Sequence, residues 1–516
     1  MNVGRSARAG WREWGGLALL ALPTMLLGLD VTALCLVVPS LAADLDPTAT
    51  ETLWIMDAYG FFIAGFLITM GTLGDRHGRR RQLMIGMAAF AAASVCAAFA
   101  PSALWLIAAR ALLGVAGATL MPSTLSLISN MFTDVRQRAL AIGVWATMFA
   151  LGMAAGPVVG GVLAAGFWWG AAFLIAVPVA VLVLACAPAL LPEFQARAGR
   201  LDLPSVGLSL GAMLSIMYAI KHAAAHGLDV QALVAVLAGG GSAVTFVRRQ
   251  LRLNEPLLDI KLFTTSRAFS AALTVLLIGL VGFGGAMFLV TQYLQLVEGL
   301  SPTMAGLWMG PPALAMLVGA IGAPLVAGRV SPGVVMAATL ALSLLGYALL
   351  ALAGTDNKLT VVAGFAFIYL GLGVIAALGT DIVVGAAPAE KSGSAAALSE
   401  TVQELGIAAG VALLGSLTTA IYRSTVEVPS GLDPSAAEAY RDSLSGASSV
   451  VTPLRAEALE NAQAAFTGGL NTAAIAAGIA IAAASVACFA TLRHVRPLGS
   501  AEAEPIASTR GSGDGW

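Results

Sequence analysis

Acidic side chains that interrupt long apolar stretches are the residues of this sequence best suited to chemistry, because burying an ionisable group in a membrane is costly. Asp30 lies in the apolar stretch 16–38, and Asp57 lies about one turn into the next stretch, 53–73. At roughly 1.5 Å per residue, both fall in the half of the membrane farther from the N-terminus. Two carboxylates facing one outer vestibule would attract a cation and carry a proton. Capping or hydration of the helix end is the alternative interpretation for Asp57.

Two further carboxylates, Glu400 and Glu404, are four residues apart and therefore share one face of a helix. Like charges in an apolar site repel each other, so one of them is expected to hold a proton, as a proton-coupled carrier requires. The alternative is a solvated position near the inner helix end, or an ion pair with Lys391. Asp381 falls near the inner end of the stretch 360–385 and is an additional candidate.

Arg110 is a basic residue within an apolar stretch. A guanidinium stays protonated and needs a partner or water, so Arg110 either forms a structural ion pair or tunes the carboxylate that carries the proton. Aromatic and methionine side chains in the spans are candidates to line an apolar cavity and to hold a cation against their π faces. These cavity-lining candidates are Trp54, Tyr59, Trp145, Met148, Phe149, Phe288, Tyr293 and Trp308.

The composition indicates which elements must position these residues. The chain of 516 residues is 58% hydrophobic and 11% charged, with a mean hydropathy of +0.87. A soluble domain does not bury so much apolar surface, and repeated apolar stretches of about 20 residues predict transmembrane helices. The sequence therefore predicts an all-α membrane protein with fourteen spans. Their approximate positions are 16–38, 53–73, 83–101, 104–126, 139–163, 168–191, 204–221, 230–247, 269–294, 304–327, 334–354, 360–385, 394–421 and 470–491.

The remaining reactive side chains point to no other chemistry. The four cysteines lie in apolar stretches, where thiols behave as small hydrophobic groups, and predict neither disulfides nor a metal site. The four histidines lie in loops or at helix ends without the spacing of metal ligands. We expect no metal, no cofactor and no nucleic-acid partner, and a membrane enzyme or lipid-handling protein is only a distant alternative.

The distribution of basic residues predicts the orientation. If the N-terminus is inside, most Lys and Arg fall in inner segments, as the positive-inside rule requires. The exceptions are Lys221, Lys358, Arg423, Arg441 and Arg455 in outer segments and Arg110 within a span. This asymmetry predicts an even number of spans, with both termini cytoplasmic, in a cell inner (plasma) membrane.

The breaks between apolar stretches divide the chain into consecutive parts. We predict a cytoplasmic N-terminus at 1–15, a six-helix half at 16–191, two inserted helices at 204–247, a cytoplasmic linker at 248–268, a second six-helix half at 269–491 and a disordered cytoplasmic tail at 492–516. The second half includes a long extracellular loop, 422–469. Its Ala/Glu-rich stretch 453–466 predicts a solvated or interfacial helix, with a gating or substrate-entry role as the alternative. Residues 322–329 weakly echo the loop after the second span, as internal repeats of secondary transporters do.

Several motifs resemble those of the major facilitator superfamily. The run from Gly71 to Arg80 is similar to its signature loop between helices two and three. Residues 110–118 are similar to the buried-arginine motif of helix four, with Leu113 where glutamine is frequent and Ala116 where glycine is. Residues 152–161 are similar to the motif associated with antiporters. The gating and structural positions that these motifs indicate are Gly71, Asp75, Arg76, Gly78, Arg79, Gly152, Gly156, Pro157 and Gly160.

Within that superfamily, the fourteen-helix drug/proton antiporters are most similar, and the quaternary-ammonium efflux pumps resemble this sequence best. The similarity covers roughly residues 10–495 and includes residues 29–39, 54–59, 255–259 and 400–406. It implies proton-driven export of lipophilic monovalent cations, such as quaternary ammonium compounds, dyes and antiseptics, by alternating access. It further implies protons, cationic small molecules and membrane lipid as partners and a monomeric state.

The resemblance also implies that the loop 71–80 is a conformational latch, in which Asp75 meets a helix dipole or an arginine of the facing half. One departure concerns charge. Pumps of this kind that handle divalent cations carry an acidic residue in helix ten, whereas residues 311–319 contain none, so divalent substrates are not expected. A narrow-specificity exporter of one antibiotic or metabolite is the alternative within the same fold.

Overall fold

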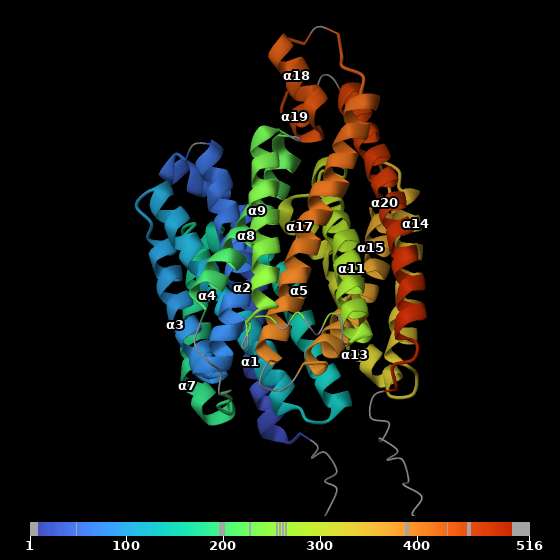
Figure 1. The fold of residues 1–516 in the computed structure, drawn as a ribbon. Coiled ribbons are helices and arrows are strands. Elements are labelled where there is room, and N and C mark those ends of the chain that lie inside the picture. Colours follow the sequence, from blue (N-terminus) through green and yellow to red (C-terminus); the bar gives the residue numbers. More distant parts are fainter. Residues whose placement is uncertain are drawn as a thin grey trace, which may run out of the picture.

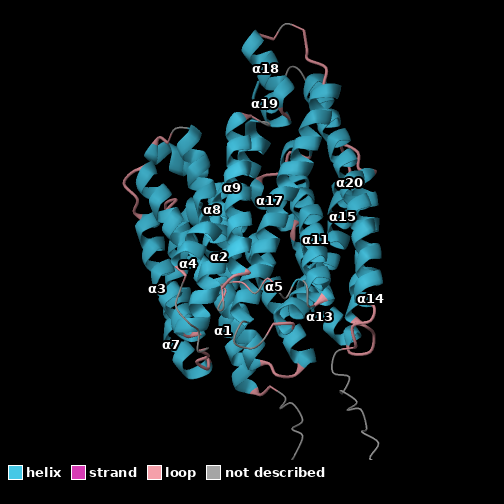
Figure 2. Cartoon of the chain, viewed as in Figure 1, coloured by secondary structure: helices cyan, strands magenta, loops and turns pink. Residues whose placement is uncertain are grey.

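The structure, a computed structural model, describes residues 9–497 with short gaps, and helices make up the described part without any strand (Figure 2). The predicted all-α fold is therefore confirmed. The gaps within that range are Thr48, 196–201, 227–228, 254–255, Leu257, Asp259, 261–262, 264–265, 388–391, Gly431 and 451–455.

The first half of the chain forms one bundle. Its helices are α1 (Trp11–Leu45), α2 (Ala49–His77), α3 (Arg79–Ala98), α4 (Ala103–Met131), α5 (Val135–Gly166), α6 (Ala171–Leu174) and α7 (Ala176–Leu190). Two helices follow before the second bundle: α8 (Leu203–His226) and α9 (Val230–Gln250).

The second bundle contains more interrupted helices. They are α11 (Arg267–Gln292), η1 (Tyr293–Val297), α12 (Pro302–Trp308), α13 (Gly310–Ala327), α14 (Pro332–Ala351), α15 (Lys358–Val374), η2 (Ile375–Gly379), α16 (Thr380–Gly385), α17 (Ser392–Thr425), α18 (Pro434–Asp442), α19 (Leu444–Val450) and α20 (Ala456–Leu492). We call the end where α1 begins and α20 ends the terminal end, and the end that carries α18 and α19 the cap end (Figure 1).

The helices are long and apolar enough to cross a membrane. Thirteen helical segments among the described residues meet that condition. The predicted span outside this set, 139–163, falls within α5, whose 32 residues extend about 48 Å at 1.5 Å per residue, more than the roughly 30 Å of a hydrocarbon core. The protein is therefore a multi-pass membrane protein, in agreement with the fourteen predicted spans.

The helices of the two bundles pair in the same pattern. α1 packs on α5, α2 packs on α4, and α3 packs on both α4 and α7. In the second bundle α11 packs on α17, α13 on α15, and α14 on both α15 and α20. The two bundles, blue to green and yellow-green to red in Figure 1, are thus built on one plan. The weak sequence echo alone did not establish this repeat.

Glycines bring these paired helices into backbone contact, because a residue without Cβ lets two helices approach closely. A Cβ on Gly152 would overlap the carbonyl oxygen of Met25, and one on Gly160 would lie 2.7 Å from the carbonyl oxygen of Ala33. In the second bundle, a Cβ on Gly284 would lie 2.6 Å from the carbonyl oxygen of Ile407. The antiporter-like motif therefore packs α5 directly on α1. Gly156 lies on the same face and would overlap Thr32, while the side chain of Pro157 is outside the described part.

Two predicted spans are interrupted. α12 ends at Trp308 and α13 begins at Gly310, because Pro311 and Pro312 have no N–H to donate and are tolerated only in a first helical turn. In the other span, the π-helical turn η2 separates α15 from α16. Such turns are frequent at functional sites, and η2 borders the cavity described below.

The inserted helices lie across the junction of the two bundles. α8 contacts α2 of the first bundle and α17 of the second. Phe61 of α2 is buried there against Met213 and Met217 of α8, with Leu405 of α17 packed on the same cluster. α9 is tied to α8 where Arg249 donates two hydrogen bonds to Asp202 (2.6 and 2.8 Å). These bonds, together with one from the Ser205 hydroxyl, lower the pKa of the Asp202 carboxyl to about 2.

The loop at the cap end differs from the prediction. The stretch 453–466 is not a separate surface helix, because its described residues form the first turns of α20, a continuous helix of 37 residues. α17 continues to Thr425, so the segment that is not part of either long helix runs only from 426 to 455. Two short helices, α18 and α19, fold within it and were not predicted. Tyr422 and Tyr440 hold them, since the Tyr422 hydroxyl donates to the Tyr440 carbonyl (2.8 Å) and the Tyr440 hydroxyl donates to that of Ala458 (2.5 Å).

Candidate functional site

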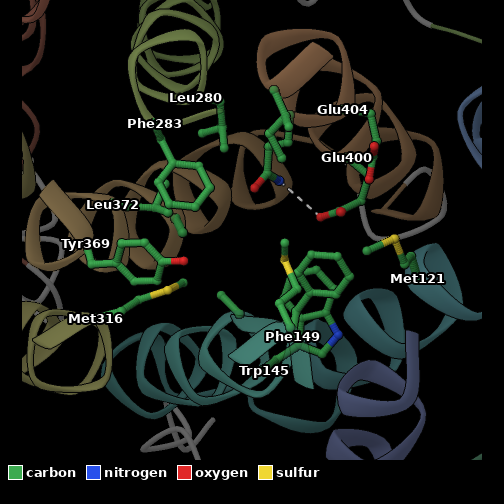
Figure 3. Close-up of a pocket in the computed structure, with 15 residues that line it drawn as sticks. Met121, Trp145, Phe149, Leu280, Phe283, Met316, Tyr369, Leu372, Glu400 and Glu404 are labelled. Atoms are coloured by element: carbon green, nitrogen blue, oxygen red, sulfur yellow. Dashed lines mark hydrogen bonds between the residues drawn. The ribbon is translucent and has the colours of Figure 1, made fainter. Parts of the chain in front are cut away.

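A cavity lies between the two bundles, and we call it the central cavity (Figure 3). Helices of both bundles contribute to its walls. The lining residues are Met121, Trp145, Ala146, Phe149 and Met153 from α4 and α5, and Leu280, Phe283, Met316, Tyr369, Leu372, Ala376, Glu400, Gln403, Glu404 and Ile407 from the second bundle.

The charged side chains of the central cavity are Glu400 and Glu404, both on α17. Their spacing of four residues places them on one helix face, as predicted. Glu400 is 4% exposed and accepts a hydrogen bond from the Gln403 side-chain amide (3.1 Å), drawn as a dashed line in Figure 3. No basic side chain lines the cavity within the described part of the chain. Lys391, the alternative partner of these carboxylates, lies outside the described residues.

Aromatic and methionine side chains form the opposite wall. Trp145 and Phe149 of α5 line the cavity, as predicted candidates, and the Trp145 indole donates to the Thr124 hydroxyl (2.9 Å), which fixes its ring. Phe283 and Tyr369 face them from the second bundle, with ring centroids 5.0 Å apart (Figure 3). Such π faces beside two carboxylates suit an organic cation.

The other predicted lining residues lie elsewhere. Trp54 is partly exposed and packs on Phe61, while Met148 and Trp308 are half-buried and do not border the central cavity. Phe288 lies nearer the cap end, and the Tyr293 hydroxyl is engaged with the Gly354 carbonyl (2.6 Å). Helical periodicity cannot decide which face of a span looks inward when every face is apolar.

The prediction missed the other residues of the cavity: Met121, Ala146, Met153, Leu280, Phe283, Met316, Tyr369, Leu372, Ala376, Gln403 and Ile407. Gln403 was within reach of sequence reasoning, because a polar residue three positions after Glu400 lies on the same helix face. The apolar members carried no signal of this kind, since their neighbours along each span are equally apolar.

Asp30 and Arg110 form a buried ion pair inside the first bundle. The Arg110 side chain is 1% exposed and also donates to the carbonyl of Ile55 (3.1 Å). Tyr59 stacks on it, with its ring centroid 4.7 Å from the guanidinium carbon. Asp30 therefore does not face an open vestibule, and the partner that Arg110 requires is this carboxylate. Asp57 lies in α2, but its side chain is outside the described part.

Tyr59 lies beside the Asp30–Arg110 ion pair. It is buried, and it is close enough to Asp30, Arg110 and Glu404 to interact electrostatically with each. The residue predicted to line the cavity is thus a neighbour of the cavity carboxylate instead. Its position connects the acidic groups of α1 and α17.

Asp381 is paired across the two bundles and does not line the central cavity. Its carboxylate accepts a hydrogen bond from Arg138 of α5 at 2.6 Å, at the terminal end of the molecule. Other polar contacts join the bundles nearby: the Ser126 and Ser392 hydroxyls lie 3.0 Å apart, and Arg136 donates to the Gly328 carbonyl (3.0 Å). We therefore assign Asp381 to the contact between the bundles.

The loop that follows α2 takes part in the same contact. Asp75 pairs with Arg79 one turn later and also accepts a hydrogen bond from the backbone N–H of Ser394 (3.1 Å), in the first turn of α17. Asp75 therefore contacts a helix end of the facing half, as expected, and the dipole at the N-terminus of that helix favours a carboxylate. Gly78 adopts φ 102°, a backbone conformation that favours glycine and lets α3 start directly after α2. The Gly71 carbonyl accepts a hydrogen bond from the Arg79 guanidinium, and the Gln195 side-chain amide donates one to the Arg76 carbonyl (2.7 Å).

Charge reversal at the Arg138–Asp381 pair is expected to open the terminal end, and reversal of both residues is expected to close it again. Arg138→Asp alone places two carboxylates side by side, and a penalty of about 1.4 kcal/mol lowers the closed population about tenfold relative to the open one. Disulfide formation between Ser126→Cys and Ser392→Cys reports the closed state. The yield should fall in Arg138→Asp and return when Asp381→Arg is added; equal yields in all three would refute the assignment.

Comparison with known proteins agrees with this architecture. The family model described as Major Facilitator Superfamily matches residues 20–411. The multidrug efflux pump LfrA of Mycolicibacterium smegmatis is 44% identical over 490 residues, which cover 93% of this chain and 97% of the relative. The methyl viologen resistance protein SmvA of Salmonella typhimurium is 34% identical over 435 residues, or 82% of this chain and 86% of the relative.

A solved structure supports the fold. The human organic anion transporter MFSD10 (TETRAN) superposes with a TM-score of 0.59 at 16% identity, over 91% of this chain and 99% of that protein. At this identity the likeness concerns the fold alone. The repeated bundles, the cavity between them and these relatives together show a transporter and not an enzyme: the chain belongs to the major facilitator superfamily and is related to its multidrug efflux pumps.

Proposed function

We propose that this protein exports lipophilic monovalent cations, such as quaternary ammonium compounds, dyes and antiseptics, in exchange for protons. The observation that carries the proposal is the pair Glu400 and Glu404 in a cavity whose other walls, apart from Gln403, are aromatic, methionine and aliphatic groups. An organic cation gains from both parts of such a site, because the carboxylates neutralise its charge and the π faces receive its apolar surface.

Competition between protons and organic cations for the carboxylates would couple proton entry to cation export. A proton and a cation cannot both occupy the same carboxylate, and each ligand shifts the protein toward the state that binds it better. Protons entering from outside load Glu400, Glu404 or Asp30 and displace the cation outward. Tyr59 links these groups, since it interacts with Asp30, Arg110 and Glu404.

The charge of the site favours monovalent cations. The segment of α13 that would carry an additional acid contributes Met316 to the cavity, so the negative charge comes from α17 alone. The names of the relatives bear on the broader class of organic cations and not on their charge: one is a multidrug efflux pump, and the other is a resistance protein for methyl viologen, a quaternary bipyridinium that carries two positive charges.

The orientation is part of the proposal. We place the terminal end in the cytoplasm and the cap end outside an inner (plasma) membrane, because the basic residues gather in the segments of the terminal end. The loop 71–80 and the Arg138–Asp381 pair then form a cytoplasmic latch. We take the monomer as the working unit, surrounded by membrane lipid.

Ethidium efflux from energised vesicles tests the function. Export should stop when the pH gradient is dissipated while the membrane potential is kept, because the proton gradient supplies the driving force. Vesicles without the protein give the background. Efflux that continues at the same rate without a pH gradient would exclude proton coupling, and a lack of any cation efflux would exclude this substrate class.

A further inference from the structure

A second cavity lies at the cap end of the second bundle. We call it the cap cavity. It is bordered by the last turns of α11 and α17, by the junction of α18 with α19, and by Phe466 of α20. The two buried tyrosines that tie α18 to α17 and α20 hold its roof in place. The predicted lining residue Phe288 belongs to this cavity.

One face of α17 lines both cavities. Glu400, Glu404 and Ile407 border the central cavity, and Val411, Gly415, Thr418 and Tyr422 border the cap cavity. The intervals of four, three, four, four, three and four residues keep all seven on the same side of the helix. Ile407 and Val411 are one turn apart, or about 6 Å along the axis. The cap cavity therefore continues the path of the central cavity toward the cap end.

A buried hydroxyl in the cap cavity lacks a partner. Thr418 is 2% exposed and borders the cavity, yet its hydroxyl oxygen makes no hydrogen bond within the described structure. Its methyl group faces α20, close to Gly469. Buried polar atoms in native proteins nearly always have a partner, so this hydroxyl marks an unsatisfied polar position in the wall of the cap cavity.

The lining of the cap cavity matches the chemistry of the central one. Phe288, Tyr422 and Phe466 supply aromatic surface, Gln292 and several hydroxyls supply polar contacts, and Asp442 supplies one carboxylate. No basic side chain borders it among the described residues. Asp442 pairs with Arg423 at 3.2 Å, but both side chains are more than half exposed, so this pair is weak and open to exchange.

From these observations we infer that the cap cavity is a second binding site for an organic cation with aromatic surface. The inference rests on the proposed function, because the ligand is the same class of molecule, received after it leaves the central cavity. The Asp442 carboxylate faces the positive charge and the three aromatic rings receive the apolar part.

Equilibrium binding of radiolabelled tetraphenylphosphonium to the purified full chain tests this inference. The wild type should bind two molecules, and Thr419→Trp, which fills the cap cavity, should bind one. Ala420→Trp is the matched control, since Ala420 is the next residue of α17, is exposed and does not border the cavity. Its stoichiometry should equal that of the wild type. Unchanged binding in Thr419→Trp would overturn the inference.

The double variant Glu400→Gln/Glu404→Gln separates this inference from the proposed function. It should retain one molecule, which Thr419→Trp then removes. The glutamate variants could bind and export as the wild type does while Thr419→Trp lowers binding. That result would refute the assignment of the central cavity as a cation site and would support the cap cavity as one. If the glutamate variants lose all binding, the cap cavity is not a site.

Chemical protection gives a second measurement that needs no bulky substitution. Ser445 borders the cap cavity and is exposed. Ser445→Cys should react with a hydrophilic maleimide several-fold more slowly when tetraphenylphosphonium is present, also in the Glu400→Gln/Glu404→Gln background. Labelling of this one peptide is read by mass spectrometry, so the native cysteines do not interfere. Equal rates with and without the cation would refute the site.

Discussion

Replacing Glu400 and Glu404 together by glutamine is expected to abolish energised cation export. Both side chains line the central cavity, and Glu400 is almost fully buried, so the cation would lose its counter-charge where water cannot replace it. Removing one member of a buried charge pair weakens the free energy of binding by about 2–5 kcal/mol, which corresponds to a loss of affinity of roughly 30-fold or more. Ethidium efflux and the dissociation constant of tetraphenylphosphonium measure the two consequences.

The single variants of this pair distinguish their roles. Glutamine preserves the shape of glutamate and keeps one acceptor oxygen for the Gln403 amide, so the fold is expected to remain intact. Glu427→Gln is the matched control, because Glu427 is exposed in the loop after α17 and lies outside both cavities. A variant that binds the cation but no longer responds to the pH gradient identifies the residue that carries the proton. Wild-type efflux in the double variant would place the site elsewhere.

Breaking the Asp30–Arg110 pair from one side is expected to destabilise the protein strongly. Arg110→Met leaves the Asp30 carboxylate, and Asp30→Asn leaves the guanidinium, without a counter-charge inside the first bundle. Removing one partner of a buried ion pair costs about 3–5 kcal/mol, whereas replacing both is often close to neutral. The thermal midpoint of the purified protein should therefore fall in each single variant and largely recover in Asp30→Asn/Arg110→Met.

Cation export by the same two single variants and the double variant is the second measurement. If Asp30 carries protons, export stays lost in the stable double variant; if the pair is only structural, export returns with the stability. Arg81→Met serves as the control for stability, because the Arg81 side chain is 71% exposed and its contact with Glu193 is long, at 3.9 Å. Equal midpoints in all variants would mean that the pair contributes nothing to stability.

The all-α fold could be predicted from the sequence because the membrane requires each spanning helix to be apolar. A span must be apolar over about 20 residues, so its position is visible in hydropathy alone. Contacts such as that of Asp75 with Ser394 were accessible through resemblance to a known motif. The cap helices α18 and α19 were not, because they are too short and too polar to leave a hydropathy or periodicity signal.

The candidate site was only partly predictable. Hydropathy locates a span along the sequence, but it does not show which side of the helix faces the cavity. Glu400 and Glu404 fix each other's direction by their spacing, so their shared face followed from sequence. The depth of Asp30 could be counted along its helix, but its partner Arg110 is 80 residues away and is chosen by packing. Likewise, nothing along α11 or α15 distinguishes Phe283 or Tyr369 from apolar neighbours that face lipid.

The contact between the bundles has a thermal consequence. Within each bundle, glycines lock helices together backbone to backbone, as Gly152 does with Met25. At the terminal end the bundles meet through hydroxyls and charges, among them Ser126, Ser392 and Asp381. They also meet where α5 packs on α13, since a Cβ on Gly143 would lie 2.5 Å from the carbonyl oxygen of Ala320. Separating the bundles therefore exposes apolar surface as well as polar groups. Because exposure of apolar surface changes the heat capacity, the reorientation step should show an activation enthalpy that varies with temperature.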